Sequence, residues 1–319
     1  MIMYADKPEE QKDQFEEYFE STIVPLIEQE NKTKDKYRSK FWGYLFSVLF
    51  LMSANVLVVL FGALMHKNAI SWGQIILINV VAFMLVFWPI YRYNKMPKND
   101  IFDVFLKYYG NWKHSEKYNV KLVHSPIIPK HDAVMAKHEI HCDFGDMRIE
   151  MRDTYYTKKS LFKCWNKEHT ISSGVILYVT FPQEFKGKLL MFEKGGFYRK
   201  SKFEGYELYN SRIDIPSANY FNIFVSDSEI GENLLHSLFF ENVLDLKDVF
   251  KTRRIYVQAE NNYMRVYLDG SEIYIDNYKL WNKKIDKNRF LQMHHEFENV
   301  YMFVQVVRSL MERKDDDRY

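Results

Sequence analysis

The densest group of side chains that could carry chemistry in this sequence is His138, His141, Cys142 and Asp143, all of residue types that bind zinc. Residues 138–144 alternate in polarity and predict a β-strand, in which successive side chains point to opposite faces. His138 and His141 would then need a β-bulge to hold one ion. Cys142 is expected to face the core with its apolar neighbours. The sequence therefore predicts no metal site here.

A second group, Asp227 and Glu229, could serve as paired carboxylates for acid–base chemistry. However, Ser226 and Glu229 have the spacing of a capping box, in which both side chains bind free backbone N–H groups at the start of a helix. Gly195-Gly196 lacks the phosphate-binding pattern and the helix that should follow it. We therefore predict no catalytic residue and no cofactor, and assign Ser226 and Glu229 to a helix cap.

The charge and cysteine content limit the classes of partner. The formal net charge of +2 argues against nucleic acid, which requires a concentrated basic face. The two cysteines, Cys142 and Cys164, are too few for a disulfide framework. One basic cluster, Arg199, Lys200 and Lys202, is a candidate for contact with anionic lipid headgroups.

The elements that must position these residues begin with two uncharged apolar runs, residues 41–65 and 70–91. Each is long enough to cross a hydrocarbon core of about 30 Å at about 1.5 Å per residue. Residues 66–69 between them leave no room for a folded domain. The sequence predicts a transmembrane hairpin with the rest of the protein on the opposite side.

Two polar residues inside the predicted spans match in depth. Asn55 lies ten residues before Met65 and Asn79 nine residues after Ile70, so both lie about 14–15 Å from the link. We expect an interhelical hydrogen bond between Asn55 and Asn79. Neither span contains an ionisable residue, which favours an anchor over a transport path.

Basic residues at the outer ends of the hairpin predict its orientation. Only Lys67 lies in the link, whereas the outer ends carry Lys32, Lys34, Lys36, Arg38, Lys40, Arg92, Lys95 and Lys98. By the positive-inside rule both termini are expected in the cytoplasm, with the protein in the cytoplasmic (inner) membrane. The acidic first 20 residues do not resemble a cleavable signal peptide.

The remainder of the chain predicts an α+β fold with an antiparallel sheet. A helical pattern over residues 97–118 is followed by strands at 138–144, 147–156, 174–181, 189–192 and 220–225, then a helix over 226–250. Further strands are expected at 254–259, 263–268 and 272–275. The expected parts are an N-terminal helix (1–40), the hairpin (41–93), the α+β domain (94–285) and a C-terminal helix with a charged tail (286–319).

Amphipathic helices are expected on both sides of these parts. The first has an apolar face of Phe15, Tyr18, Phe19, Ile23, Leu26 and Ile27, with a kink or break at Pro25. The second has a heptad stripe of Phe290, Met293, Phe297, Val300, Val304, Val307 and Met311. This stripe could form a homo-oligomer, although a helix that covers the sheet is the alternative we favour.

Three motifs resemble a bacterial family of uncharacterised two-pass membrane proteins, catalogued as domain of unknown function 3137. They are Phe15-Glu-Glu-Tyr-Phe with Val24-Pro-Leu, the run from Gly174 to Gly187, and Phe224-Val-Ser-Asp-Ser with the helix after it. The resemblance extends to about Trp281, and residues 290–311 look like an addition. Ser228 stands where the family commonly has a second acid. The resemblance implies no activity and no catalytic residues.

These observations favour a membrane-anchored module, in which the hairpin tethers a cytosolic α+β domain that contacts an unknown protein partner or the lipid surface. An enzyme with an unrecognised site in that domain is the first alternative. A pore or transporter subunit assembled from several hairpins is the weaker one.

Overall fold

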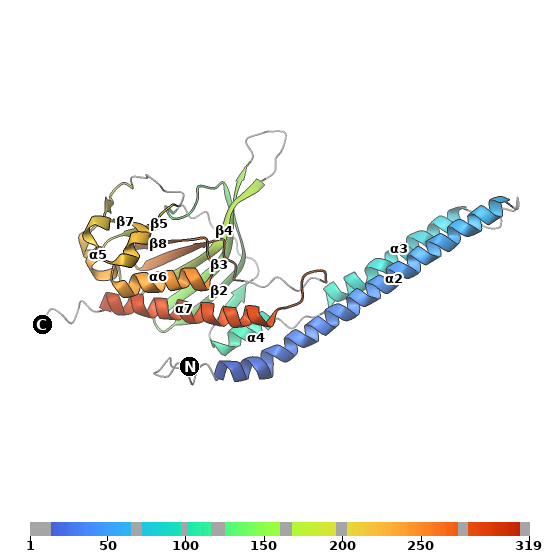
Figure 1. The fold of residues 1–319 in the computed structure, drawn as a ribbon, viewed down its shortest axis with the longest axis horizontal. Helices are drawn as coiled ribbons and strands as arrows, with labels where there is room; N and C mark the ends of the chain where they lie inside the picture. Colours follow the sequence, from blue (N-terminus) through green and yellow to red (C-terminus); the bar gives the residue numbers. More distant parts are fainter. Residues whose placement is uncertain are drawn as a thin grey trace. The chain divides into compact units, whose positions relative to one another are not determined.

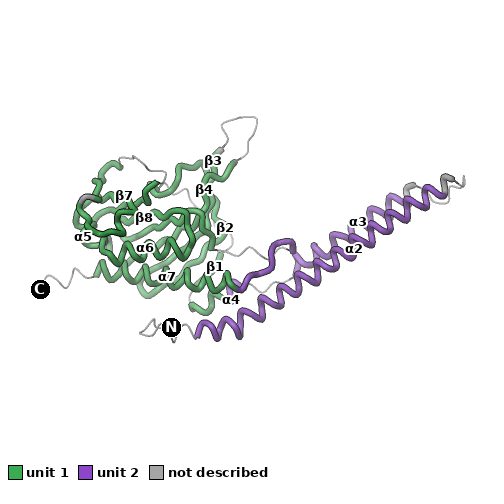
Figure 2. Tube along the Cα trace, viewed as in Figure 1, with its two compact units in different colours: residues 1–3, 105–274, 288–319 green, residues 4–104, 275–287 purple. Residues whose placement is uncertain are grey.

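The computed structural model describes residues 14–64, 72–96, 101–110, 112–115, 125–159, 168–195, 203–273 and 280–312. The chain forms two compact units (Figure 2). Unit 1 consists of residues 1–3, 105–274 and 288–319, and unit 2 of residues 4–104 and 275–287. The link 66–69 and the basic cluster Arg199, Lys200 and Lys202 lie outside the described residues.

Unit 1 is built on an antiparallel sheet, which confirms the α+β class. Nine strands are described, in the order β1-β2-β3-β4-β9-β8-β5-β7-β6 (Figure 1). The strands are β1 (Lys113–Ser115), β2 (Ala133–Phe144), β3 (Met147–Lys159), β4 (Glu168–Thr180), β5 (Leu189–Glu193), β6 (Glu207–Leu208), β7 (Phe221–Val225), β8 (Arg254–Glu260) and β9 (Tyr263–Asp269). The described edge strands β1 and β6 are short, which limits edge-to-edge pairing with other chains.

Helices α5 (Ser228–Leu234), α6 (Ser237–Val249) and α7 (Lys287–Glu312) cover one face of this sheet (Figure 1). Alternate residues of each strand face them: Phe221 of β7 stacks on Phe240 of α6, and Cys142 of β2 meets Tyr301 of α7. Six residues of the predicted heptad stripe, Phe290, Met293, Phe297, Val300, Val304 and Val307, are buried. The structure therefore favours the alternative in which this helix covers the sheet.

The other face of the sheet carries an aromatic cluster. Its buried members are Ile127, Ile128, Tyr156, Ile176, Leu190, Phe192, Tyr256 and Tyr267. Ile127 and Ile128 come from the connection between β1 and β2, and Phe203 from the connection between β5 and β6 packs against the cluster. Short 3-10 turns, Asn210–Arg212 and Pro216–Tyr220, lead from β6 to β7.

Three sequence predictions for the part of the chain after α3 differ from the structure. The helix expected over 97–118 is described from Ile101 as α4 (Ile101–Tyr108) and ends earlier than expected, because Gly110 has a φ of +85° and residues 113–115 pair with β2. The helix expected over 226–250 breaks at Leu235 between α5 and α6. Of the strand expected at 272–275, residues 274–275 lie outside the described residues. Residues 272–273 are not in a strand, and their carbonyls accept hydrogen bonds from the Arg289 guanidinium instead.

The predicted capping box is wrong in its N-terminal member. The N-cap of α5 is Asp227, whose carboxylate accepts the Glu229 N–H at 2.9 Å. The Ser226 hydroxyl instead accepts the Lys188 N–H at 2.8 Å, because residue 226 continues the pairing of β7 with β5 by one residue. Glu229 forms an ion pair with Lys186 at 3.3 Å.

Unit 2 contains the apolar helices. A helix runs from Gln14 as far as the end of α2 (Val24–Leu64), and α3 covers Trp72–Lys95. Of the kink or break predicted at Pro25, the break is absent: a π-helical turn at Phe19–Ile23 precedes the proline and the helix continues. A wider turn accommodates a residue that lacks an N–H and crowds the preceding turn.

Helices α2 and α3 pack against each other within unit 2. Val48 meets Ala82 and Val86 there, and the Asn55 amide donates to Asn79 Oδ1 at 3.0 Å. Outside this contact the apolar side chains are exposed. Only 6% of the most apolar segment of the first helix and 17% of that of α3 are buried. Both helices are long and apolar enough to span a membrane.

Candidate functional site

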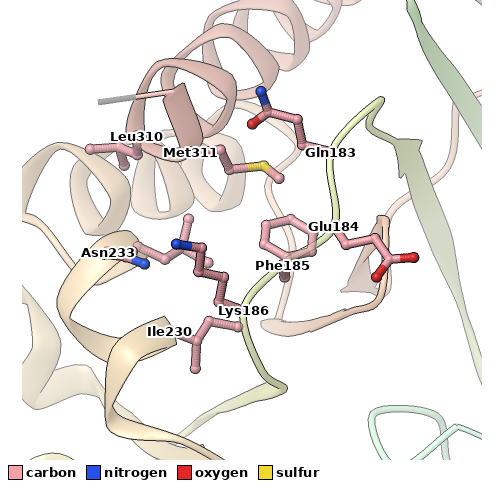
Figure 3. Close-up of a pocket in the computed structure, with 9 residues that line it drawn as sticks. Gln183, Glu184, Phe185, Lys186, Ile230, Asn233, Leu310 and Met311 are labelled. Atoms are coloured by element: carbon pink, nitrogen blue, oxygen red, sulfur yellow. The ribbon is translucent and has the colours of Figure 1, made fainter. Parts of the chain in front are cut away.

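A pocket of about 300 Å³ opens in unit 1 where three elements meet (Figure 3). The connection between β4 and β5 contributes residues 183–186, α5 contributes three residues, and the end of α7 contributes Leu310 and Met311. This volume is at the lower end of the range for small-ligand pockets. The pocket is the candidate binding site of this unit.

Local backbone contacts hold the β4–β5 connection against α5. The Ser226 N–H donates to the Lys188 carbonyl at 2.9 Å, and the Ser226 hydroxyl accepts the Lys188 N–H. Gly187 has a φ of +129°, and a Cβ there would lie 3.2 Å from Asp227 Cβ. Only glycine accommodates both the angle and this close approach.

The lining of the pocket is amphipathic. Phe185, Ile230 and Met311 supply apolar surface, while Lys186 and Asn233 supply polar groups. The Asn233 Oδ1 atom is buried and has no hydrogen-bond donor among the described residues. A buried acceptor without a donor costs free energy, which a ligand carrying an N–H or O–H group would recover. The pocket therefore suits a small amphipathic group with a hydrogen-bond donor.

A second arrangement, in unit 2, fixes residues 280–287 along α2. Asn31 makes a two-way contact with Ile285: its amide donates to the Ile285 carbonyl at 3.0 Å, and its Oδ1 accepts the Ile285 N–H at 2.9 Å. Arg38 donates to the carbonyls of Leu280 and Asn282. We call residues 280–287 the α2 strap.

Charges reinforce this contact. Lys34 is fully buried and donates to the Lys283 carbonyl at 3.1 Å. Lys284 pairs with Asp35 at 2.6 Å, and Trp281 packs edge-on against Phe41 at 4.8 Å between ring centroids. The strap thus occupies one face of α2 over about three turns, next to the apolar run.

Sequence reasoning missed the strap, although a signal exists. Asn31, Lys34, Arg38 and Phe41 continue the spacing of the apolar face that ends at Ile27. A polar continuation of an apolar helix face indicates that backbone or polar groups pack there. The eight strap residues have no periodic pattern of their own, so the sequence does not indicate that they are the segment that packs against this face of α2.

The structure separates the residues that the sequence analysis considered as zinc ligands. His138 contacts His114 at 3.3 Å between ring nitrogens, while His141 lies 3.8 Å from Glu139. Cys142 is buried, and burial raises the pKa of its thiol to about 12. The described residues contain no group of three or more His, Cys, Asp or Glu suited to a metal ion.

A buried carboxyl lies between α7 and the sheet in unit 1. Glu296 is 1% exposed and pairs with Arg289, and its Oε2 atom has no hydrogen-bond partner among the described residues. Burial raises the pKa of Glu296 to about 7, against the opposing effects of Arg289 and Gln292. The carboxylate of Asp153 on β3 contributes to the same rise.

The fold and these sites define an α+β protein with an antiparallel sheet, of which nine strands are described, and a pair of adjacent apolar helices. A family model described as "Protein of unknown function (DUF3137)" matches residues 170–311, which confirms the resemblance seen in the sequence. The matched region runs from β4 to α7. Our expectation that residues 290–311 are an addition was wrong, since the match includes them.

Among solved structures, the chain is similar to the crystal structure of the mycobacterial trehalose monomycolate transport factor A, TtfA. The two share 9% sequence identity with a TM-score of 0.39, over 65% of this chain and 92% of that one. A similarity this low defines neither the fold nor the function of this chain. No curated protein matches the chain.

Proposed function

We propose that this protein is a membrane-anchored binding module. Helices α2 and α3 cross the membrane as a hairpin, and the α+β unit lies on the cytoplasmic side. The observation that carries this proposal is the exposed apolar surface of the two helices. Side chains such as Phe50, Leu57 and Phe61 on α2 are 79%, 66% and 65% exposed. Such a surface is stable in lipid and not in water.

The division of charge supports the cytoplasmic side. The outer ends of the helices carry eight basic residues against Lys67 alone in the link. Basic residues in short flanking segments remain on the cytoplasmic side of the membrane. This orientation places residues 14–40 and everything after α3 in the cytoplasm.

The pocket supports a binding role for the tethered unit. Its apolar wall with an unmatched acceptor at Asn233 suits a small amphipathic group of a ligand or partner. The stripe on α7 is largely buried against the sheet, so a partner must use another surface. Tethering raises the effective concentration of such a unit for partners in or near the membrane.

The anchor is tested by alkaline carbonate extraction of membranes from cells that express the full chain. We expect the wild type to stay in the pellet. The variant V81R/L85R places two cations on the exposed apolar face of α3, each at a cost of about 2.5–3.5 kcal/mol in the membrane centre. It should shift to the supernatant, while the control V81L/L85I stays in the pellet. A wild type found in the supernatant would refute the anchor.

The binding role is tested with a variant that fills the pocket. Met311→Trp adds a large ring to the lining, and Met302→Trp is its control because Met302 lies 49% exposed on the same helix. After mild detergent extraction, the wild type and the control should copurify with a partner in stoichiometric amount, and Met311→Trp should not. Absence of any such partner with the wild type would contradict the binding role.

A further inference from the structure

The basic residues that precede the apolar run of α2 are divided between two faces of the helix. Lys34 and Arg38 point to the α2 strap, where backbone carbonyls accept their hydrogen bonds. Lys32, Lys36 and Lys40 are exposed and follow one another every four residues. At 3.6 residues per turn, this spacing forms one row on nearly the opposite side of the helix from Arg38.

The acidic residues of the same helix do not neutralise this row. Glu28 pairs with Lys287 and Asp35 with Lys284, both on the α2 strap. Glu30 accepts a hydrogen bond from Tyr93 of α3. Among the described residues, Lys32, Lys36 and Lys40 have no carboxylate partner within 4.0 Å. The strap therefore leaves an uncompensated positive row on the other face.

Helix α3 brings further cations to the same level. The rings of Tyr37 and Tyr93 lie 5.8 Å apart, which places the turn around Tyr37 of α2 beside the basic end of α3. Arg92 lies 5.1 Å above the ring of Trp88, and Lys95 the same distance above Tyr91. Both rings are about half exposed. Exposed aromatic rings beside cations are typical of the boundary between hydrocarbon and headgroups.

The depth of each cation follows from its distance to the apolar run. The headgroup layer is about 5–8 Å thick on each side of the hydrocarbon core. Lys40 directly precedes Phe41. Measured from Phe41 along the helix axis at 1.5 Å per residue, Lys36 lies about 7.5 Å and Lys32 about 13.5 Å outside the apolar run. Lys36 and Lys40, with Arg92 and Lys95, therefore fall within the headgroup layer, and Lys32 outside it.

We propose that Lys36 and Lys40 of α2, with Arg92 and Lys95 of α3, form a binding surface for anionic phospholipid headgroups. The proposal rests on the proposed membrane anchor. It differs from the candidate cluster at Arg199, because it uses only residues beside the apolar helices. Glu28 and Asp35 of α2 pair with the α2 strap and not with the lysine row. Anionic lipid phosphates supply the negative charge for the lysines instead.

The test uses the full-length protein in liposomes that contain brominated lipid, which quenches nearby tryptophans. Trp42 and Trp88 lie at the ends of the apolar runs and act as native probes. Quenching by brominated phosphatidylglycerol is compared with quenching by brominated phosphatidylcholine. For the wild type we expect a higher relative association constant for the anionic lipid, which falls as salt rises. The variant K36Q/K40Q should lower this preference by roughly five-fold for each lysine.

Two further variants separate the proposal from a general effect of charge. K32Q, outside the headgroup layer, should change the preference much less than K40Q. The control K107Q/K113Q removes two exposed lysines of unit 1 and should leave it unchanged. Equal quenching by both lipids in the wild type, or an unchanged preference in K36Q/K40Q, would overturn the proposal while the anchor stands. Quenching by neither lipid would overturn the anchor itself.

Discussion

At the scale of single residues, Gly174 is under the strongest steric constraint in the sheet. It lies on β4 opposite Asp269 of β9, where a Cβ would come within 2.3 Å of the Leu268 carbonyl oxygen. The same Cβ would lie 2.9 Å from the ring of Tyr267, which is fully buried. The absence of a side chain at position 174 thus permits both the strand pairing and the aromatic cluster.

We expect Gly174→Ala to destabilise unit 1. The backbone of β9 would have to move, and overpacking of this kind costs about 1–3 kcal/mol. Thermal unfolding of the full chain in detergent, followed by the tyrosine signal in near-ultraviolet circular dichroism, measures the change. Ser173→Ala is the control, because it alters the adjacent side chain without adding an atom between position 174 and the Leu268 carbonyl. Equal unfolding temperatures for Gly174→Ala and the wild type would contradict the prediction.

Glu296 makes the stability of unit 1 depend on pH. Its folded pKa of about 7 lies above its reference value of 4.5, so the folded state binds more protons between these values. Its contribution to stability is fully present below about pH 4.5 and is lost as the pH rises through 7. At about 1.4 kcal/mol per pKa unit, the loss is on the order of 3 kcal/mol.

The variant Glu296→Gln stays neutral at every pH and should remove this dependence. Its unfolding temperature should match the wild type near pH 5 and exceed it near pH 8, since only the wild type then buries a charge. Glu312→Gln, on the exposed end of the same helix, should follow the wild-type profile at both values. A wild type and Glu296→Gln with parallel profiles from pH 5 to 8 would show that this carboxyl does not titrate as described.

At the scale of elements, the α2 strap and α2 form a joint made mostly of side chain to backbone hydrogen bonds. Three polar residues of one helix face, Asn31, Lys34 and Arg38, satisfy carbonyls between positions 280 and 285. The strap is irregular and has no helix or sheet hydrogen bonds to satisfy its own backbone groups. The side-chain bonds from α2 therefore keep it ordered. The strap is continuous in sequence with the start of α7 at Lys287.

Asn31→Ala should loosen the strap locally, because it removes both bonds to Ile285. The loss of a partly buried pair of this kind costs about 1–3 kcal/mol, which corresponds to roughly 5- to 150-fold faster local opening. Hydrogen–deuterium exchange of the Ile285 amide in the full chain measures this directly. Thr33→Ala changes a neighbouring residue whose hydroxyl bonds only within the helix, to Gln29, and should leave exchange at Ile285 unchanged. Equal exchange of the Ile285 amide in the two variants would show that Asn31 does not hold the strap on α2.

Elements with strong periodic patterns were predictable from the sequence, and those fixed by distant partners were not. The hairpin β2–β3 and the pair β8–β9 appear where alternation and turns at Gly145 and Asn261 place them. In contrast, β1 and β6 have only three and two residues, too few for a pattern. The pocket joins residue 186 to residue 311, and nothing local in either segment indicates that contact.

At the scale of the whole molecule, the proposed position of the α+β unit on the cytoplasmic side rests on one charge difference. The outer ends of the apolar helices are basic, and the link between them carries Lys67 alone. Five of the basic residues precede the first apolar run, and the first segment usually dominates orientation. The strap holds two of those five by backbone carbonyls, which leaves their charge in place.

Orientation is measured with reporters fused to the full chain in a bacterial host. Alkaline phosphatase is active only outside the cytoplasm, so a C-terminal fusion should be inactive, while a green fluorescent protein fused there should fluoresce. A variant that moves the positive charge to the other side, with K32Q, K36Q and K40Q combined with H66K, N68K and A69K, should raise the phosphatase signal and reduce fluorescence. The three glutamine substitutions alone are the control for lost charge without added charge in the link, and should give an intermediate or unchanged signal. An active phosphatase on the wild-type chain would place the α+β unit outside the cytoplasm and refute the orientation.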